Sequence, residues 1–167
     1  MSTARRASRQ AALQVLYALD VGHGGVPGGA PDEVFEGVAA HFELPEGARA
    51  FAKQLVTGVS QQRESIDALI AEHATNWRVA RMAAVDRNVL RMAVYEMREG
   101  ATPRTVAIDE AVELARRFGS ERSSAFVNGV LDAVARSLDA REPAGPRREP
   151  SRRSSRGSAP TPSWEEP

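Results

Sequence analysis

The sequence contains no cysteine at any of its 167 positions. Disulfides and thiolate zinc sites are therefore excluded, and a reducing, cytoplasmic setting is the natural expectation. No apolar run approaches the ~20 residues that a membrane-spanning helix needs. The N-terminal residues contain arginines and continue into an amphipathic pattern without an apolar h-region, so we expect no signal peptide. These absences predict a cytoplasmic protein that does not enter a membrane.

The chain also lacks a net charge. Its 22 basic residues balance its 22 acidic residues, which argues against a uniformly basic nucleic-acid binder. A nucleic-acid site would therefore require local clustering of basic side chains. All of the basic residues except Lys53 are arginines.

Catalytic, metal and cofactor motifs are missing as well. His23, His41 and His73 lie far apart and show no metal-ligand spacing. The glycine-rich stretch HGGVPGGAP lacks the lysine and the strand–helix context of a phosphate loop, and serine hydrolase signatures are absent. Carboxylates alternate with arginines on the predicted helices, which is typical of a solvated face. A binding protein without enzymatic activity, metal or cofactor is the favoured interpretation.

Helical periodicity is what the sequence has in abundance. The stretch Thr102–Leu138 predicts two helices joined by a polar corner, because apolar residues recur at steps of three and four. Gly119 is expected to end the first helix in the left-handed conformation. Gly129, inside the second helix, is interpreted as a close approach of another helix. The stripe of the first helix comprises Ile108, Ala111, Val112, Ala115 and Phe118.

The same periodicity predicts helices over about 3–21, from Pro31 onward, and over about 83–98 with a stop at Gly100. The stretch 46–74 is either one long helix or two helices that meet near Gly58–Ser60. Since no segment alternates with a period of two, the domain is predicted to be all-α. The inward-facing residues expected after Pro31 are Val34, Val38 and Phe42.

The composition changes after about residue 138. Residues 139–167 are rich in proline, serine, arginine and glutamate, and they cannot bury enough apolar surface to offset the entropy lost on ordering. We therefore predict a folded domain over 1–138 and a disordered tail over 139–167. Whether the arginines of the tail add non-specific attraction to RNA stays open.

Three segments resemble the NusB family of bacterial transcription antitermination proteins: ARRASRQAALQVLYALD, VDRNVLRMAVYEM and VAIDEAVELARRFGSERSSAFVNGVLDAVA. They follow the order and spacing of the family and cover roughly Thr3–Leu138. The resemblance implies a compact all-α domain of about seven helices in two packed bundles. It also implies binding to the single-stranded boxA element of ribosomal RNA operon transcripts. The implied partners are NusE, a small-subunit ribosomal protein, and the RNA polymerase elongation complex with other Nus factors.

The resemblance also assigns residues to these functions. Arginines at the start of the first helix oppose the helix dipole, and a polyanion would explain them, since guanidinium groups grip phosphates and stack on unpaired bases. The family often has lysine where this chain has Ala125 and an acid where it has Arg122, which puts the geometry of RNA binding in question. The implied RNA-binding residues are Arg5, Arg6, Arg9, Tyr17, Arg122, Phe126 and Asn128. The implied NusE-facing residues are Asp86, Arg91 and Glu96.

Alternatives remain beside an antitermination factor. A NusB-like domain also occurs at the front of ribosomal RNA cytosine methyltransferases, and a helical DNA-binding or protein-interaction scaffold would share the same periodicity. Tyr17 and Phe126 are either stacking platforms or core residues. The oligomeric state, monomer or homodimer, is open as well, because an apolar face can be buried within the fold or against a second copy.

Overall fold

The computed structural model describes residues 3–22 and 30–142. The prediction of a tail from residue 139 is wrong for residues 139–141, which belong to a helix that ends at Arg141. The predicted tail from residue 143 onward lies outside these ranges, as does most of the HGGVPGGAP loop. The described residues hold seven α-helices, one 3₁₀ turn and no strand, which confirms the all-α prediction. The elements are α1 (Thr3–Val21), α2 (Pro31–Ala39), α3 (Ala48–Gln61), α4 (Arg63–His73), η1 (Val79–Arg81), α5 (Ala84–Glu99), α6 (Arg104–Phe118) and α7 (Ser123–Arg141).

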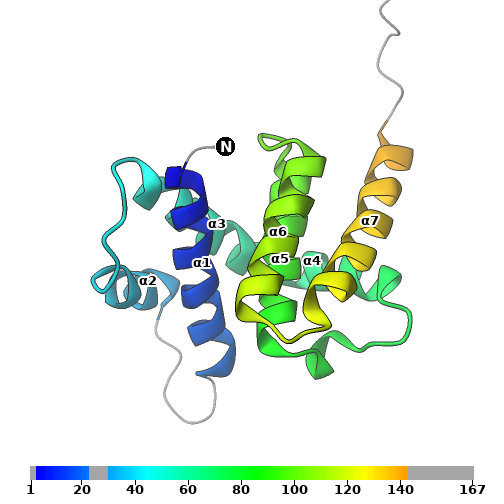
Figure 1. Ribbon diagram of the computed structural model, residues 1–167, viewed down its shortest axis with the longest axis horizontal. Coiled ribbons are helices and arrows are strands. Elements are labelled where there is room, and N and C mark those ends of the chain that lie inside the picture. The colour runs from blue at the N-terminus through cyan, green and yellow to red at the C-terminus, as the bar shows by residue number, and fades with distance from the viewer. Residues whose placement is uncertain (1–2, 23–29, 143–167) are drawn as a thin grey trace, which may run out of the picture.

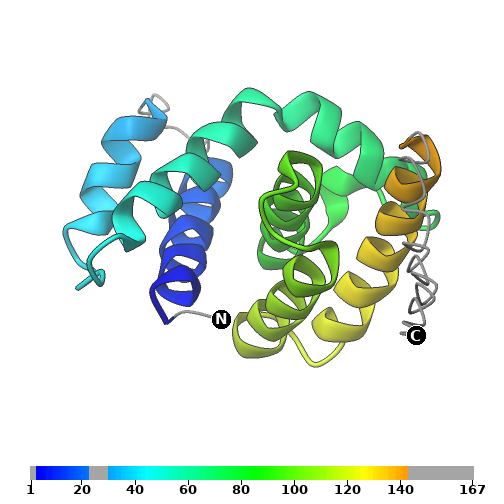
Figure 2. The same cartoon turned by 90° about the horizontal axis from the view of Figure 1, so that it is seen from above.

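The helices form two groups that lie side by side (Figure 1). Helices α1, α2 and α3 pack against one another, while α4, α6 and α7 gather around α5. Helix α5 also packs against α1 and α3, so it joins the two groups. Figure 2 shows α3 and α4 running one after the other along one side of the molecule, across both groups. The two predicted bundles are therefore present and share α5.

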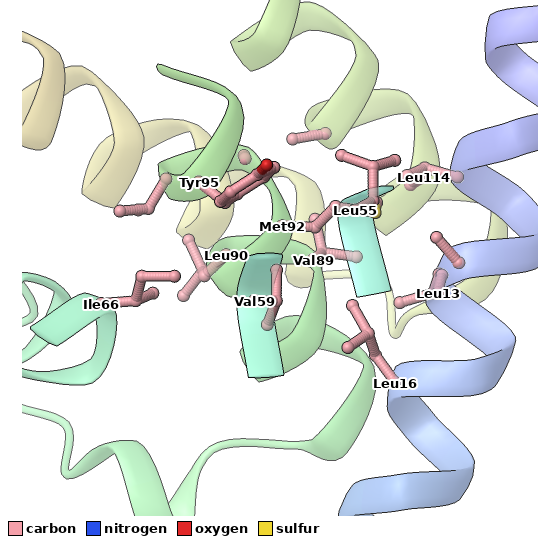
Figure 3. Close-up of a cluster of buried hydrophobic side chains, with 14 of the residues drawn as sticks. Leu13, Leu16, Leu55, Val59, Ile66, Val89, Leu90, Met92, Tyr95 and Leu114 are labelled. Carbon is pink, nitrogen blue, oxygen red and sulfur yellow. The ribbon is translucent and has the colours of Figure 1, made fainter. Parts of the chain in front are cut away.

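Apolar side chains from all seven helices meet in one buried cluster. Leu13 of α1, Leu55 of α3 and Leu114 of α6 lie around Met92 of α5 in Figure 3. Helix α5 is the most deeply buried element, since its residues from Asn88 to Met97 are all buried. Because α5 is surrounded on all sides, its polar side chains must find partners within the protein.

The stretch predicted as one helix or two is two helices, and the change of direction occurs at Gln62 (φ −106°, ψ 13°) rather than at Gly58–Ser60. Gly58 has a different role. A Cβ built there would lie 2.2–2.6 Å from ring atoms of Tyr95, so this glycine lets α3 and α5 approach closely. The inward face predicted for α2 is confirmed in part, since Val34 and Val38 pack against the core cluster. Phe35 and Ala39 are buried there, while the expected residues Val34, Val38 and Phe42 are only partly buried.

Gly100 behaves as expected from the sequence. It ends α5 in the left-handed conformation with φ 75°. Gly119 follows the last residue of α6, as predicted, but the left-handed conformation predicted for it is wrong, because its backbone is extended (φ −91°, ψ −165°). The Ser120 amide that follows donates to the Ser123 hydroxyl oxygen at 2.9 Å. The prediction for Gly129 is also wrong. A Cβ there would meet nothing within 4 Å, so no neighbouring helix among the described residues requires this glycine.

Candidate functional site

Arg9 does not belong to an exposed phosphate-binding site in this structure. Its side chain is 2% exposed, and its guanidinium donates to both carboxylate oxygens of Glu96 at 2.8–3.1 Å. The carboxylate of Glu110 lies 4.0 Å away on the other side. Two sequence-based assignments are thereby corrected. Neither Arg9, expected to contact RNA, nor Glu96, expected to contact NusE, is at the surface, because each satisfies the charge of the other inside the fold.

Arg5 and Arg6 are exposed at the start of α1, as an RNA-binding role requires. The Arg5 guanidinium lies 4.2 Å from the centre of the Phe51 ring on α3, a cation–π contact. Arg6 donates to Glu110 on α6 at 3.3 Å, with more than half of its side chain exposed. These contacts orient both guanidinium groups without removing them from solvent.

Arg91 is also misassigned by the sequence, since it is buried and bridges helices rather than facing a partner. It donates to both carboxylate oxygens of Asp67 on α4 at 2.7 and 2.9 Å, and its Nη1 lies 3.5 Å from Asp20 of α1. Arg87 and Asn88 donate to the same Asp20 oxygen at 2.8 and 2.9 Å. This polar network holds the end of α1 against α5 and α4.

The network also sets the charge state of Asp20. Burial by itself would raise the pKa of this carboxyl group. The hydrogen bonds from Arg87 and Asn88, together with the positive charges of Arg87 and Arg91, outweigh burial and lower the pKa below its ordinary value of 3.8. Asp20 is therefore a carboxylate at neutral pH, and α5 supplies the cations that stabilise it.

Tyr17 is exposed, as a stacking platform must be. Its side chain is 43% exposed and lies at the opposite end of α1 from Arg5. Twelve residues of helix separate the two, which is roughly 18 Å along the axis. Tyr17 borders a cleft of about 250 Å³ between α1 and α6. Tyr17 and the exposed arginines Arg5 and Arg6, all expected to bind RNA, therefore lie at opposite ends of α1.

A second cleft, of about 410 Å³, brings together residues that the sequence assigned to two different ligands. It is lined by Arg122 and Phe126, expected to bind RNA, and by Asp86, expected to face NusE. Trp77 forms another wall, with its ring in an edge-to-face contact with Phe126 at 6.0 Å. Asp86 is 9% exposed, and its Oδ1 has no hydrogen-bond partner among the described residues.

Asn128 is exposed on α7 but lines neither cleft. It lies two residues after Phe126, which turns it by roughly 200° around the helix axis. The structure thus separates Asn128 from Arg122 and Phe126, although all three belong to one sequence motif.

The structure adds residues that the sequence did not single out. Trp77 is 57% exposed, and Phe118, predicted as part of the apolar stripe of α6, is 41% exposed. Phe118 is the last residue of α6. The sequence signal for Trp77 was its position between Asn76 and Arg78, outside any apolar stripe. Several exposed arginines in this part of the chain have no ion pair within the described ranges. They are Arg78, Arg81, Arg117 and Arg122.

Within the described ranges, no helix is both long enough and apolar enough to cross a membrane. The same residues contain no group of three or more histidine, aspartate or glutamate side chains positioned to hold a metal ion.

Curated relatives resemble the chain over most of its length. The transcription antitermination protein NusB of Sorangium cellulosum is 47% identical over 141 residues, which is 81% of this chain and 94% of the relative. The protein of the same name from Desulforapulum autotrophicum is 45% identical over 133 residues, covering 78% of this chain and 90% of the relative.

Solved structures agree in fold. NusB of T. maritima superposes with a TM-score of 0.71 at 35% identity, covering 81% of this chain and 93% of that one. A chain from a crystal structure of the antitermination factors NusB and NusE in complex with double-stranded RNA superposes with a TM-score of 0.72 at 29% identity, covering 82% and 99%. The sequence model of the NusB family matches residues 6–136. With this match and these identities, the chain belongs to the NusB family.

Proposed function

We propose that this chain is a transcription antitermination factor that catalyses no reaction. It binds the single-stranded boxA element of ribosomal RNA operon transcripts together with NusE, in the cytoplasm, where it joins the RNA polymerase elongation complex with other Nus factors. Membership of the NusB family supports the class of function. One observation carries the RNA part, namely that Tyr17 and Phe118 line one cleft while Trp77, Phe126 and Arg122 line a second one.

The RNA surface in this proposal begins at the start of α1 and continues to its other end. Arg5 and Arg6 supply exposed guanidinium groups for phosphates. Tyr17, Phe126 and Arg122 supply ring faces and positive charge for unstacked bases and their phosphates. This combination suits single-stranded RNA, which is recognised through splayed bases on aromatic platforms beside basic side chains.

The partner surface in this proposal is centred on Asp86. Asp86 lines the cleft together with Trp77 and Phe126, and its Oδ1 is buried without a partner among the described residues. An arginine or lysine from NusE would pair with the carboxylate and contact the aromatic rings. Since Phe126 and Arg122 line the same cleft, RNA and NusE would meet there on adjoining surfaces. Of the three residues first assigned to NusE, Asp86 is the one that keeps this role.

The proposal is tested by measuring the affinity of a boxA-like single strand at several salt concentrations, with and without purified NusE. NusE should tighten binding, and a scrambled strand should bind more weakly. The variant Arg5→Ala/Arg6→Ala should flatten the salt dependence, reducing the slope of log affinity against log salt by roughly 0.7 for each phosphate that the variant no longer binds. Arg141→Ala is the control, because Arg141 is exposed and pairs with Glu72 away from this surface.

Two results would count against the proposal. Equal affinity for boxA-like and scrambled strands, with or without NusE, would contradict the proposed role in antitermination. If the slope of log affinity against log salt is unchanged in Arg5→Ala/Arg6→Ala, the start of α1 does not contact RNA. The rest of the proposal would still hold.

A further inference from the structure

The cleft between α1 and α6 has a chemical character of its own. In Figure 1 these two helices lie toward the viewer, and α5 lies behind them. Only Tyr17 among the lining residues was connected with RNA by the sequence. The full lining consists of Gln10, Leu13, Gln14, Tyr17, Val85 and Phe118.

The cleft has two aromatic side chains at its edge, one from each helix. Tyr17 and Phe118 are 43% and 41% exposed, and neither ring is needed to close the core. Large exposed rings that face one cleft on a folded protein indicate a binding site. The Arg117 guanidinium lies 5.5 Å from the centre of the Phe118 ring, so positive charge is present at the rim.

The polar side chains of the cleft are two glutamines. Neither Gln10 nor Gln14 makes a side-chain hydrogen bond within the part of the chain that the structure describes. Each amide offers one carbonyl acceptor and two N–H donors. The edge of a nucleobase carries the complementary acceptors and donors, and its faces are flat and apolar. A cleft with two rings and two such amides therefore matches the shape and the hydrogen-bonding groups of a base.

The cleft is continuous with the arginine-rich end of α1. Positions 6, 10, 14 and 17 are three or four residues apart, so they share one face of the helix. Gln10 lines both this cleft and a narrower one of about 70 Å³ that contains Arg6 and Arg117. A single strand bound by the exposed arginines of α1 would thus reach the cleft along this face.

Charge along the groove favours an anionic ligand. The two acids that line the narrow cleft are already paired, Glu110 with Arg6 at 3.3 Å and Glu113 with Arg116 at 2.6 Å. Arg117 has no ion-pair partner within the described ranges. The unpaired charge that remains there is positive, as a phosphate of the same nucleotide or its neighbour would require.

We infer that this cleft binds one unstacked nucleobase of single-stranded RNA. Tyr17 and Phe118 stack on the base, Gln10 and Gln14 hydrogen-bond to its edge, and Arg117 contacts a neighbouring phosphate. The inference rests on the proposed RNA-binding function and deepens it, since it adds Gln10, Gln14, Arg117 and Phe118 to the surface and assigns them one base.

The test is a double-mutant cycle between the protein and an RNA from which single bases are removed. Abasic nucleotides are placed one at a time along the boxA-like strand, and affinities are measured for the wild type and for Phe118→Leu. Leucine keeps apolar volume but removes the flat ring, so folding is preserved. In the wild type, removal of the bound base should weaken binding by roughly 5- to 150-fold. In Phe118→Leu, most of that effect should vanish at one position only.

Val21→Ala is the matched control, because Val21 is an exposed apolar residue at the same end of α1 that does not line the cleft. Its abasic effects should equal those of the wild type at every position. If the effects in Phe118→Leu are also unchanged at every position while the RNA still binds, the base site is overturned and the proposed function survives. If the wild type binds no single-stranded RNA, both fail. If Phe118→Leu weakens only NusE binding, the cleft is a protein site and the inference is overturned.

Discussion

Arg9 of α1 and Glu96 of α5 form a buried ion pair between residues 87 positions apart in the sequence. Both oxygens of the carboxylate accept from the guanidinium, and Thr102 lies 3.5 Å from one of them. The ion pair therefore links α1 to α5. A pair of this kind contributes to stability chiefly because removing one member leaves an uncompensated buried charge.

Arg9→Ala should therefore lower the free energy of unfolding by about 3–5 kcal/mol. Arg6→Ala is the matched control, and its cost should be below about 1 kcal/mol because that arginine is exposed. Urea denaturation of both variants measures the difference. Replacing both members, as Arg9→Met/Glu96→Met, should recover most of the stability, since no charge is then left unpaired. Equal destabilisation by Arg9→Ala and Arg6→Ala would show that the pair is not buried.

Phe126 should show both a stability effect and an affinity effect. It is partly buried against the core cluster and touches the exposed ring of Trp77. Phe126→Ala should cost about 1–2 kcal/mol of stability, less than a fully buried phenylalanine would, and about 1–3 kcal/mol of RNA affinity. Trp77→Ala, at the more exposed ring, should cost less stability. Thermal unfolding and RNA binding are measured on the same preparations. A large decrease in stability together with normal RNA binding would show that Phe126 serves only as a core residue.

Two glycines inside helices should respond to alanine with opposite signs. Gly58→Ala should destabilise the protein by about 1–3 kcal/mol, because the new methyl group would overlap the ring of Tyr95. Gly129→Ala should stabilise it by up to about 1 kcal/mol, because alanine favours a helix and nothing among the described residues obstructs the methyl group. The melting temperatures of both variants, compared with that of the wild type, show whether the two changes in stability have opposite signs. Two changes of the same sign would contradict the packing described for α3 and α5.

The carboxylate of Asp20 should make stability depend on acid pH. Its pKa in the folded state lies below 3.8, so its contribution is present above the unfolded pKa and is lost as pH falls through the folded one. Asp20→Asn removes charge-assisted hydrogen bonds and should cost about 1.5–3 kcal/mol near pH 7. The difference between wild type and variant should shrink as pH falls below 3.8. A difference that stays constant down to pH ~2 would show that Asp20 is not the titrating group.

Several helix boundaries could be predicted from the sequence because they depend on local chemistry, whereas the one between α3 and α4 was placed too early. Apolar spacing, the proline at the start of α2 and the glycine after α5 placed those elements correctly. The roles of glycines inside helices could not be predicted from the sequence. Whether Gly58 or Gly129 meets another helix depends on which element packs there, and that is settled by contacts between residues distant in the sequence.

The sequence by itself determined an all-α fold and a NusB-type set of motifs, since periodicity and motif order depend only on the order of residues along the chain. Only the tertiary structure decided which charged side chains are exposed. Arg9, Arg91 and Glu96 resemble surface residues in the sequence, yet they are buried because α5 lies at the centre of the fold and its charges must be compensated inside. Conversely, Phe118 has the sequence pattern of a core residue, yet it is exposed at the last position of α6. Burial and pairing follow from how the helices meet, and no local pattern encodes them.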